Sequence, residues 1–290
     1  MLKITGAQQE PGETMQFRSV PRIHKPSAQQ FQQECIQANR PVVLTGLLDD
    51  WPALAKWGDI QYLRAKGGSQ TVELRNMNPT GTSFTRKVTL DQYLDEVASN
   101  QGALQEDYLA DLPLAAALPG LVDDLGPLEC CQADLSDMVV LMGRRTYAPL
   151  HFHKRVDTIS AQIVGRKKFI LFDPAESKNL YPNPWYSILY HFSRMDLRTG
   201  TPDPEHRTRY SRAQGWEVTL SAGECLYIPV HFWHVVYGDP EFNLLVVAPF
   251  LSDVRRWHSP YPGYAVHLHQ RVPKRIQDYL LSRRLVHRSA

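Results

Sequence analysis

The sequence predicts a mainly β protein with flanking helices, in which a sandwich or jelly-roll barrel follows an N-terminal supporting region. From about residue 136 the chain contains short β-like runs separated by Gly, Pro and Asp: DMVVLMG, DTISAQIVG, KKFILFDP, WEVTLSAG, CLYIPV and FNLLVVAPF. Many short strands with turns between them are typical of sandwiches and barrels, and not of alternating β/α sheets. We therefore expect residues 136–252 to form the core of the fold.

The preceding region, residues 16–135, has the pattern of a support built from helices and strands. Ser27 and Thr89 each begin a capping box that leads into an amphipathic stretch. The segment RPVVLTGLL has the pattern of a buried strand, and DDWPALAKWG that of a turn into a helix. We expect residues 1–15 to be a flexible N-terminus.

Two further segments lie outside this predicted barrel. Residues 175–214 form an insertion rich in Pro, Tyr, Asp and Arg, and an insertion of this size is typical of a functional or covering loop. Residues 253–290 include the basic, helical-looking stretch VPKRIQDYLLSRRLVHRSA. We interpret this tail as a solvated or dimer-forming helix rather than a nucleic-acid contact, because charge runs are usually exposed faces. A homodimer is expected.

The composition argues against several classes of protein. The chain has 32 Lys plus Arg against 30 Asp plus Glu, and this net charge of +2 gives no global attraction to nucleic acid or to an anionic membrane. Its 4 cysteines include no Cys-x-x-Cys spacing, so neither a zinc knuckle nor a disulfide framework is expected. No stretch approaches the length of a membrane-spanning helix, and the N-terminus has no apolar signal core. We expect a cytoplasmic protein without a membrane partner.

The stretch PLHFHKRVDTISAQIVGRKKF, residues 149–169, holds His151 and His153 two positions apart. Side chains at positions i and i+2 of a strand point to the same side, so these two imidazoles can converge on one metal ion. A third ligand must come from another strand, and AGECLYIPVHFWHVV offers His231 and His234. Because two histidines occur at this spacing by chance, the interpretation depends on the rest of the chain.

Several segments occur in a specific order and spacing: RPVVLTGLLDDWPALAKWG, YLADLPLAAALPGLVDDL, APLHFH with AQIVGRKKFILFDP, YHFSRMDL, and LSAGECLYIPVHFWHVV. Through them nearly the whole chain resembles the JmjC and cupin family of iron(II), 2-oxoglutarate-dependent oxygenases. It is most similar to the small JmjC hydroxylases related to the asparaginyl hydroxylase that inhibits hypoxia-inducible factor. This resemblance implies a double-stranded β-helix, or jelly-roll, core. It also implies that iron(II), 2-oxoglutarate and O2 are used to hydroxylate a peptide, protein or small-molecule substrate.

The resemblance also assigns roles to individual residues. It implies that His151 and His234 are metal ligands, that Lys167 pairs with the far carboxylate of 2-oxoglutarate, and that Thr146 lies beside that cosubstrate. A dianionic keto acid that chelates iron needs a cation, preferably with a hydroxyl donor, at its far end. Thr158 stands where the family often has an Asn, so it is expected to contact the cosubstrate as well.

His153 stands where the family has an aspartate ligand. Three neutral histidines leave iron(II) at a formal charge of +2 instead of +1, and such a site also admits copper, nickel or zinc. Asp157 is the alternative carboxylate, but along a regular strand it lies about 13 Å from His153, too far to share a metal. A bulge between residues 153 and 157 could re-aim it. We expect His151, His153 and His234 to form the catalytic metal site, with Asp157 as the open alternative.

The remaining candidates have simpler interpretations. His231 is expected to support the site while facing away from His234, His191 to pack within the covering loop, and Lys168 to be exposed. Surface or interface positions are expected for three histidines outside the barrel core, His258, His267 and His269.

Three functions stay open. The leading one is a 2-oxoglutarate-dependent hydroxylase. The second is a three-histidine metal cupin with different oxygenase or lyase-like chemistry, and the third is a non-catalytic binding protein on a JmjC scaffold that engages RNA through its basic tail.

Overall fold

The computed structural model describes residues 15–76, 85–99, 107–131, 137–185, 187–253 and 256. The first strands are β1 (Arg18–Ser19), β2 (Arg22–His24), β3 (Val42–Thr45), β4 (Thr71–Asn76), β5 (Thr85–Thr89) and β6 (Asp107–Pro113). They are followed by β7 (Val139–Gly143), β8 (Tyr147–His151), β9 (Val156–Val164), β10 (Arg166–Phe172), β11 (Gly215–Ser221), β12 (Glu224–Ile228), β13 (Trp233–Gly238) and β14 (Asn243–Leu251). The helical segments are α1 (Ala28–Phe31), the π-helical η1 (Gln32–Gln37), α2 (Pro52–Lys56), α3 (Ile60–Gly67), α4 (Leu90–Ser99), α5 (Leu114–Ala117), η2 (Pro119–Asp124), η4 (Pro174–Asn179) and α6 (Pro204–Tyr210).

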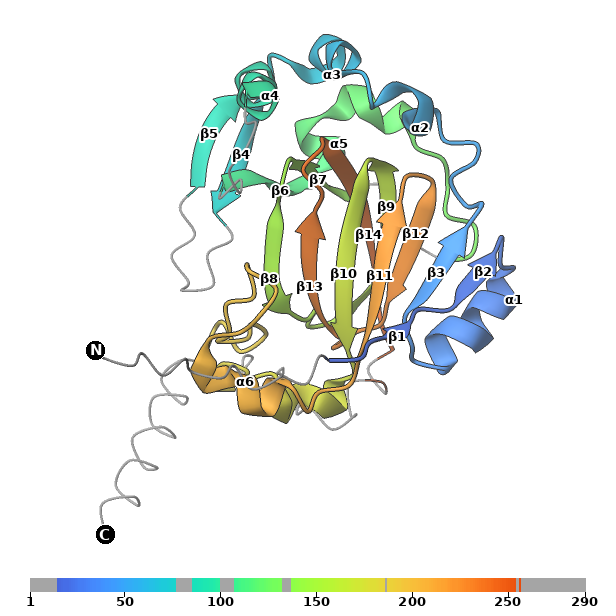
Figure 1. Ribbon diagram of the computed structural model, residues 1–290. Helices are drawn as coiled ribbons and strands as arrows, with labels where there is room; N and C mark the ends of the chain where they lie inside the picture. Colours follow the sequence, from blue (N-terminus) through green and yellow to red (C-terminus); the bar gives the residue numbers. More distant parts are fainter. Residues whose placement is uncertain are drawn as a thin grey trace, which may run out of the picture.

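Two β-sheets face each other and form a jelly roll (Figure 1). Within the described residues, one sheet has five strands in the order β1-β11-β10-β13-β8, and the other has nine in the order β2-β3-β12-β9-β14-β7-β6-β4-β5. Strands that are distant in sequence are neighbours, as β8 is with β13 and β3 with β12, and both pairs are antiparallel. This topology is that of a jelly-roll barrel, so the predicted fold class is confirmed.

The turn between β9 and β10 shows how the sequence sets the register of the barrel. Gly165 occupies this turn with φ +70°, and a Cβ there would lie 2.5 Å from the carbonyl oxygen of Phe242. Glycine is therefore required both by its conformation and by the close backbone approach. The alternation that follows directs Lys167 into the barrel and Lys168 outward, where its Nζ lies 2.7 Å from Glu217. Lys168 is half-buried, although it was predicted to be exposed.

Two helices before the barrel, α1 and α4, begin at the predicted capping residues. The Ser27 hydroxyl accepts a hydrogen bond from the backbone N–H of Gln30 at 3.2 Å. Thr89 and Gln92 form a reciprocal capping box, with distances of 2.9 and 3.2 Å. Helices α2, α3 and α4 arch over one end of the two sheets (Figure 1). The region that we predicted as a support thus closes one end of the jelly roll.

Residues 175–214 pack against β8. Their backbone forms a bridge between Phe192 and His151, and the N–H of Ser193 donates to the carbonyl of Leu150 at 2.8 Å. The segment has a hydrophobic core of its own, which it shares with β8, β10 and β13 and which includes Leu180, Tyr190, Met195 and Leu197. It therefore covers the strand that carries the first histidine of the site.

Large aromatic side chains belong to the core. Trp51, Trp57 and Trp233 are all buried, and the four cysteines are free. The predicted helix within residues 253–290 lies outside the described residues, which include only Asp253 and Arg256 of that range. The flexible N-terminus predicted for residues 1–15 likewise falls outside them, except for residue 15.

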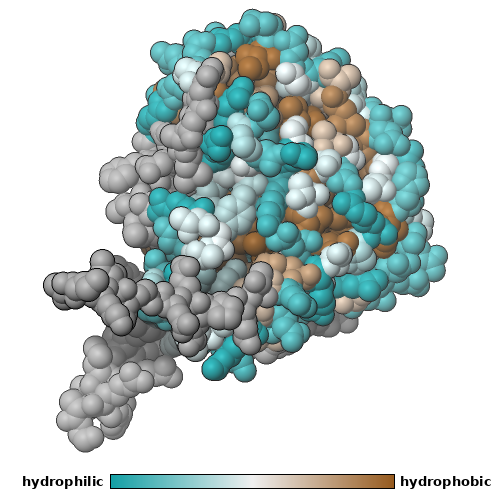
Figure 2. Space-filling model, viewed as in Figure 1, coloured by the Kyte–Doolittle hydropathy of each residue, from teal (hydrophilic) through white to brown (hydrophobic). Residues whose placement is uncertain are grey.

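The surface agrees with the composition. Hydrophilic residues cover much of the face shown in Figure 2, with apolar residues in smaller patches among them. Large apolar side chains that are exposed among the described residues are Trp185, Ile188 and Leu251. No helix in the described part of the chain has the length and apolar character needed to cross a bilayer.

Candidate metal and cosubstrate site

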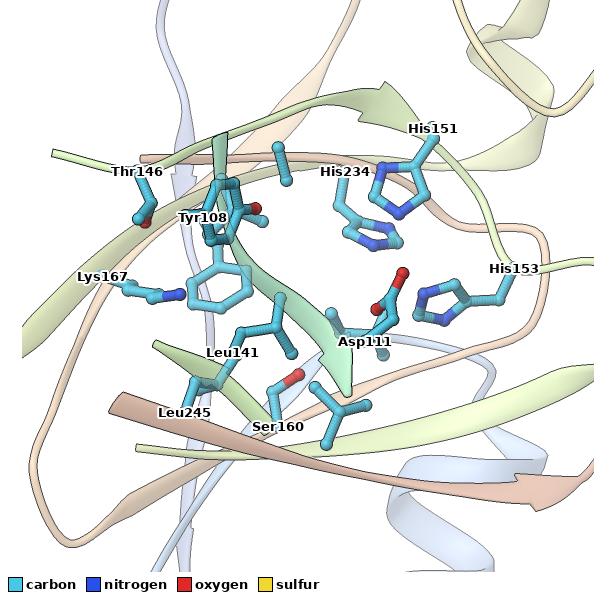
Figure 3. Close-up of a pocket in the computed structure, with 15 residues that line it drawn as sticks. Tyr108, Asp111, Leu141, Thr146, His151, His153, Ser160, Lys167, His234 and Leu245 are labelled. Atoms are coloured by element: carbon cyan, nitrogen blue, oxygen red, sulfur yellow. The ribbon is translucent and has the colours of Figure 1, made fainter. Parts of the chain in front are cut away.

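A pocket lies between the two sheets and is lined by side chains from both (Figure 3). The five-stranded sheet contributes His151 from β8, Lys167 from β10 and His234 from β13. From the nine-stranded sheet come Tyr108, Asp111, Leu141, Ser160, Ile228, Leu245 and Val247. The fold therefore brings together polar groups that are far apart in the sequence.

Three histidines converge at one end of this pocket. His151, His153 and His234 each offer one ring nitrogen, and these three atoms lie within 4.8 Å of one another. His151 and His234 are directly opposite in the antiparallel β8–β13 pair, and their ring centroids are 4.2 Å apart. The ring centroid of His153 lies 5.5 Å from that of His151 and 4.7 Å from that of His234. The three predicted ligands are thus placed together.

His153 reaches the cluster by a different route from the one predicted. β8 ends at His151 and β9 begins at Val156, so His153 lies in the connection between two strands and not on a strand. The predicted bulge between residues 153 and 157 is replaced by this turn. The i, i+2 argument therefore identified two residues that do lie together, although only the first of them lies on a strand.

Backbone carbonyls orient two of the rings. The Nδ1 atom of His151 is 2.7 Å from the carbonyl of Pro149, and Nδ1 of His234 is 3.0 Å from the carbonyl of Phe232. Because a carbonyl only accepts, each Nδ1 carries the proton and each Nε2 keeps a free lone pair. This is the tautomer that a metal ligand needs, held by the kind of outer contact that metal-binding histidines use.

Thr158 holds the third ring. It is buried on β9, and its hydroxyl lies 3.3 Å from Nδ1 of His153. Thr158 does not line the pocket, whereas Ser160, two residues further along the same strand, does. The contact predicted between Thr158 and a cosubstrate is therefore corrected: this side chain lies behind a histidine of the cluster.

Burial keeps the three histidines neutral. It lowers the pKa of His151, with the carbonyl of Pro149 acting in the opposite direction. It lowers the pKa of His153 to about 3, helped by repulsion from His151, and it holds the pKa of His234 well below its usual value. Near neutral pH all three rings are therefore in the unprotonated form that binds metals.

Lys167 occupies the opposite end of the pocket. Its side chain is buried, and no carboxylate of the described residues lies within ion-pair distance of its Nζ. Burial lowers the pKa of Lys167 to about 7, and the negative charge of Asp111 opposes this effect. Figure 3 shows Thr146 and Tyr108 near Lys167, with the histidines at the other end. Because an unpaired buried cation is costly, this end of the pocket is suited to an anionic ligand.

Asp157 is engaged elsewhere. Its Oδ1 accepts hydrogen bonds from the Tyr227 hydroxyl at 2.8 Å and from the Val230 N–H at 3.0 Å. Its Oδ2 lies 2.6 Å from the guanidinium of Arg256. Asp157 is buried in this network and does not line the pocket. The alternative in which it replaces His153 as a ligand is therefore wrong.

The other histidines behave as expected where they are described. His231 adopts φ +65°, and its Nε2 contacts the carbonyl of Lys154 at 3.0 Å, outside the cluster. His191 packs among aromatic rings of the covering segment, including Phe152 and Tyr190. The predictions for three further histidines have no outcome, because these residues lie outside the described part of the chain: His258, His267 and His269.

Three residues that line the pocket were missed by the sequence interpretation. Tyr108 and Asp111 come from β6, and Ser160 comes from β9. The stretch YLADLPLAAALPG is rich in alanine and leucine, which gives no clear strand pattern. Only at its start do Tyr108, Ala110 and Leu112 occupy alternate positions, as in a strand. The pairing of β6 with β7 decides that this segment is extended.

Comparison with known proteins agrees with this geometry. A cupin-like domain family matches residues 28–260. The chain is 32% identical over 227 residues to lysine-specific demethylase 8 of Xenopus tropicalis, covering 75% of the chain and 50% of that protein. It is 28% identical over 239 residues to Jumonji C domain-containing protein 5 of Drosophila melanogaster, covering 78% and 58%. The chain belongs to the JmjC proteins of the cupin-like family.

A third relative is the human tRNA wybutosine-synthesizing protein 5, which is 26% identical over 251 residues, covering 79% of the chain and 76% of that protein. The chain spans about half the length of the first of these relatives. The three histidines and Lys167, to which the resemblance assigned roles, line one pocket.

Proposed function

We propose that this JmjC chain is a metal-dependent oxygenase that uses iron(II), 2-oxoglutarate and O2 to hydroxylate a C–H bond. The observation that carries the proposal is the placement of three neutral imidazoles and one buried ammonium at opposite ends of a single pocket. The family membership supports it.

The donor set fits a divalent transition metal. Imidazole nitrogen suits iron, and three ligands leave coordination positions for a cosubstrate and for O2. His151, His153 and His234 would hold the ion, and Pro149 and Phe232 would keep two of the rings in the ligating tautomer. When bound, iron(II) would activate O2 as the oxidant, with two electrons from the oxidative decarboxylation of the keto acid and two from the C–H bond.

The residues at the Lys167 end of the pocket are suited to bind the far carboxylate of 2-oxoglutarate. Lys167 would pair with that carboxylate, and the hydroxyls of Thr146 and Tyr108 are placed to donate to it. Ion pairing in a buried pocket favours the protonated amine, so the acid itself would raise the pKa of Lys167. Charged hydrogen bonds of this kind are stronger than neutral ones.

The proposed substrate is a peptide or protein side chain, with a small molecule as the other class. The name of one relative states lysine demethylation and that of another states synthesis of a tRNA base. Demethylation of an N-methyl group begins with hydroxylation of its carbon, so one C–H step serves demethylases and hydroxylases alike. The covering segment, which bridges His151 through Phe192, carries the exposed side chains of Trp185 and Ile188, which are suited to contact an apolar part of a substrate.

A second candidate is a three-histidine cupin that does not use 2-oxoglutarate. It is favoured by His153, because a site of three imidazoles also accepts copper, nickel and zinc. It is disfavoured by Lys167, whose buried charge has no described partner and would have no role without an anion.

One experiment separates the two candidates. The protein is purified without oxygen, its metal is determined, and iron(II) and 2-oxoglutarate are added. We expect the visible charge-transfer band of an iron–keto-acid chelate, and succinate on exposure to air. His234→Ala should lose both, whereas Lys167→Ala should bind metal normally and lose the band. Iron binding without the band in the unmodified protein would contradict the use of 2-oxoglutarate.

We also propose that the chain forms a homodimer through residues 253–290. Light scattering on the full chain should give twice the mass of 33.1 kDa. A chain that ends at residue 256 should give a monomer, and a dimer of that shortened chain would place the interface elsewhere.

A further inference from the structure

An irregularity in β6 places one acidic side chain in the pocket. In the β6–β7 pair, Leu109 lies opposite Met142 and Leu112 lies opposite Val140. Two residues of β6 therefore face a single residue of β7, which is the pattern of a β-bulge. The second of the two, Asp111, has φ +51°, in the left-handed region that aspartate tolerates better than most residues. Bulges re-aim side chains, and this one turns Asp111 out of the regular alternation.

The carboxylate of Asp111 faces the histidine cluster. It lines the same pocket as the three histidines, and Figure 3 shows its oxygens pointing toward the rings of His153 and His234. Its negative charge also acts on Lys167 at the other end of the pocket, where it raises the pKa against the effect of burial. The only described cation within ion-pair distance is Arg75, whose Nη1 is 3.4 Å from Oδ2. That pair is long and the Asp111 side chain is 51% exposed, so Arg75 does not neutralise the carboxylate.

The charge of a bound metal ion explains why a carboxylate at this position would be useful. Three neutral imidazoles bind a divalent ion without reducing its charge, so the buried site keeps a formal +2. A carboxylate beside the ion reduces the local charge to +1, as in the two-histidine, one-carboxylate sites of iron(II) oxygenases. Since Asp157 is bound to Arg256, Asp111 is the carboxylate of the described residues that lines the pocket.

We propose that Asp111 is the anionic member of the metal site: its carboxylate, brought in by the β6 bulge, compensates the charge of an ion held by His151, His153 and His234. The three histidine nitrogens lie within 4.8 Å of one another, and Asp111 is not part of this cluster. Its carboxylate would therefore act from outside the ligands and not as a fourth ligand. His153 stands where the family has an aspartate, and β6 thus supplies a carboxylate from another strand. This inference rests on the proposed metal-dependent function.

The test measures metal affinity without 2-oxoglutarate. Manganese(II) or cobalt(II) is titrated calorimetrically into metal-free protein. Asp111→Asn keeps the shape and removes the charge, and it should weaken binding about 10- to 100-fold, the usual effect of losing an outer contact of a metal site. Glu217→Gln is the control, because Glu217 is an ion-paired carboxylate on the outside of β11. It should bind metal like the unmodified protein.

A second variant distinguishes charge compensation from a merely structural role. His153→Asp returns a carboxylate to the ligand set, so in this background Asp111→Asn should weaken binding much less than it does alone. A structural role predicts the same loss in both backgrounds. Arg75→Gln, which frees the Asp111 carboxylate, should bind metal at least as tightly as the unmodified protein.

The outcomes separate this inference from the function on which it rests. If the unmodified protein binds iron and forms succinate but Asp111→Asn binds metal with unchanged affinity, the role of Asp111 is wrong and the proposed function stands. Equal losses in the two backgrounds also overturn it. If the unmodified protein binds no divalent metal, both proposals fail.

Discussion

The carboxylate of Asp157, on β9 opposite Phe250 of β14, lies 2.6 Å from the guanidinium of Arg256 and does not line the pocket of the histidine cluster. The hydroxyl of Tyr227 and the N–H of Val230 complete its hydrogen bonds. A carboxylate that was a candidate metal ligand in the sequence is thus a structural group that ties the chain after the barrel to its wall.

Replacement of Asp157 should therefore affect stability and not metal binding. Asp157→Ala leaves Arg256 without its buried partner, and removal of one member of such a pair costs about 3–5 kcal/mol. Urea unfolding measures this loss, and calorimetry with manganese(II) measures the metal affinity of the folded fraction. Asp157→Asn keeps an acceptor for Val230 and should lose less stability. A folded Asp157→Ala protein that cannot bind metal would return Asp157 to the ligand set.

Thr158→Val should loosen the His153 ring while keeping the volume of the side chain. The valine removes the hydroxyl that lies 3.3 Å from Nδ1 of His153. Because outer contacts fix ring orientation, we expect metal affinity to fall about 10-fold. Thr219→Val, at an exposed position of β11, is the matched control. Unchanged affinity in Thr158→Val would show that the turn alone orients His153.

The affinity for 2-oxoglutarate should decrease as the pH rises above neutrality. Burial lowers the pKa of Lys167 to about 7 in the protein without its anion, so the fraction of protonated amine falls from pH 6.5 to pH 9. Only the protonated amine pairs with the far carboxylate. Titrations of the manganese(II)-loaded protein over this range should show the decrease. An affinity that stays constant up to pH 9 would mean that Lys167 does not anchor the acid.

Gly165→Ala should destabilise the fold more than Gly223→Ala. Both glycines have positive φ, +70° and +88°, so both variants carry the cost of a left-handed alanine, about 1–2 kcal/mol. At Gly165 the new Cβ would also collide with the Phe242 carbonyl, whereas at Gly223 it meets nothing within 4 Å. Thermal unfolding of the two variants gives the difference directly. Equal losses would show that the β9–β10 turn relaxes easily around the extra carbon.

Much of the barrel could be predicted from local patterns. The turns after each short strand and the capping boxes at Ser27 and Thr89 depend only on residues close in sequence. They can therefore be predicted without knowing which strands pair. His151 and His234 were predictable as a pair because short strands in a jelly roll become neighbours.

The contributions of β6 were not predictable in the same way. The position of Asp111 depends on an extra residue in the β6–β7 pairing and on a left-handed backbone, neither of which has a signature in YLADLP. Thr158 shows a similar limit, since its contact with His153 exists only because the chain turns between β8 and β9. Features that arise from the pairing of distant segments need the three-dimensional structure.

The backbone bridge between Phe192 and His151 ties the covering segment to the metal end of the pocket. The N–H of Phe152 donates to the carbonyl of His191 at 3.0 Å, and the rings of Phe192 and His151 stack with centroids 5.4 Å apart. The segment cannot swing away from β8 without breaking these contacts. A substrate that displaces it would pull on the strand that carries His151, so under the proposed function binding at the outer surface would disturb the histidine cluster.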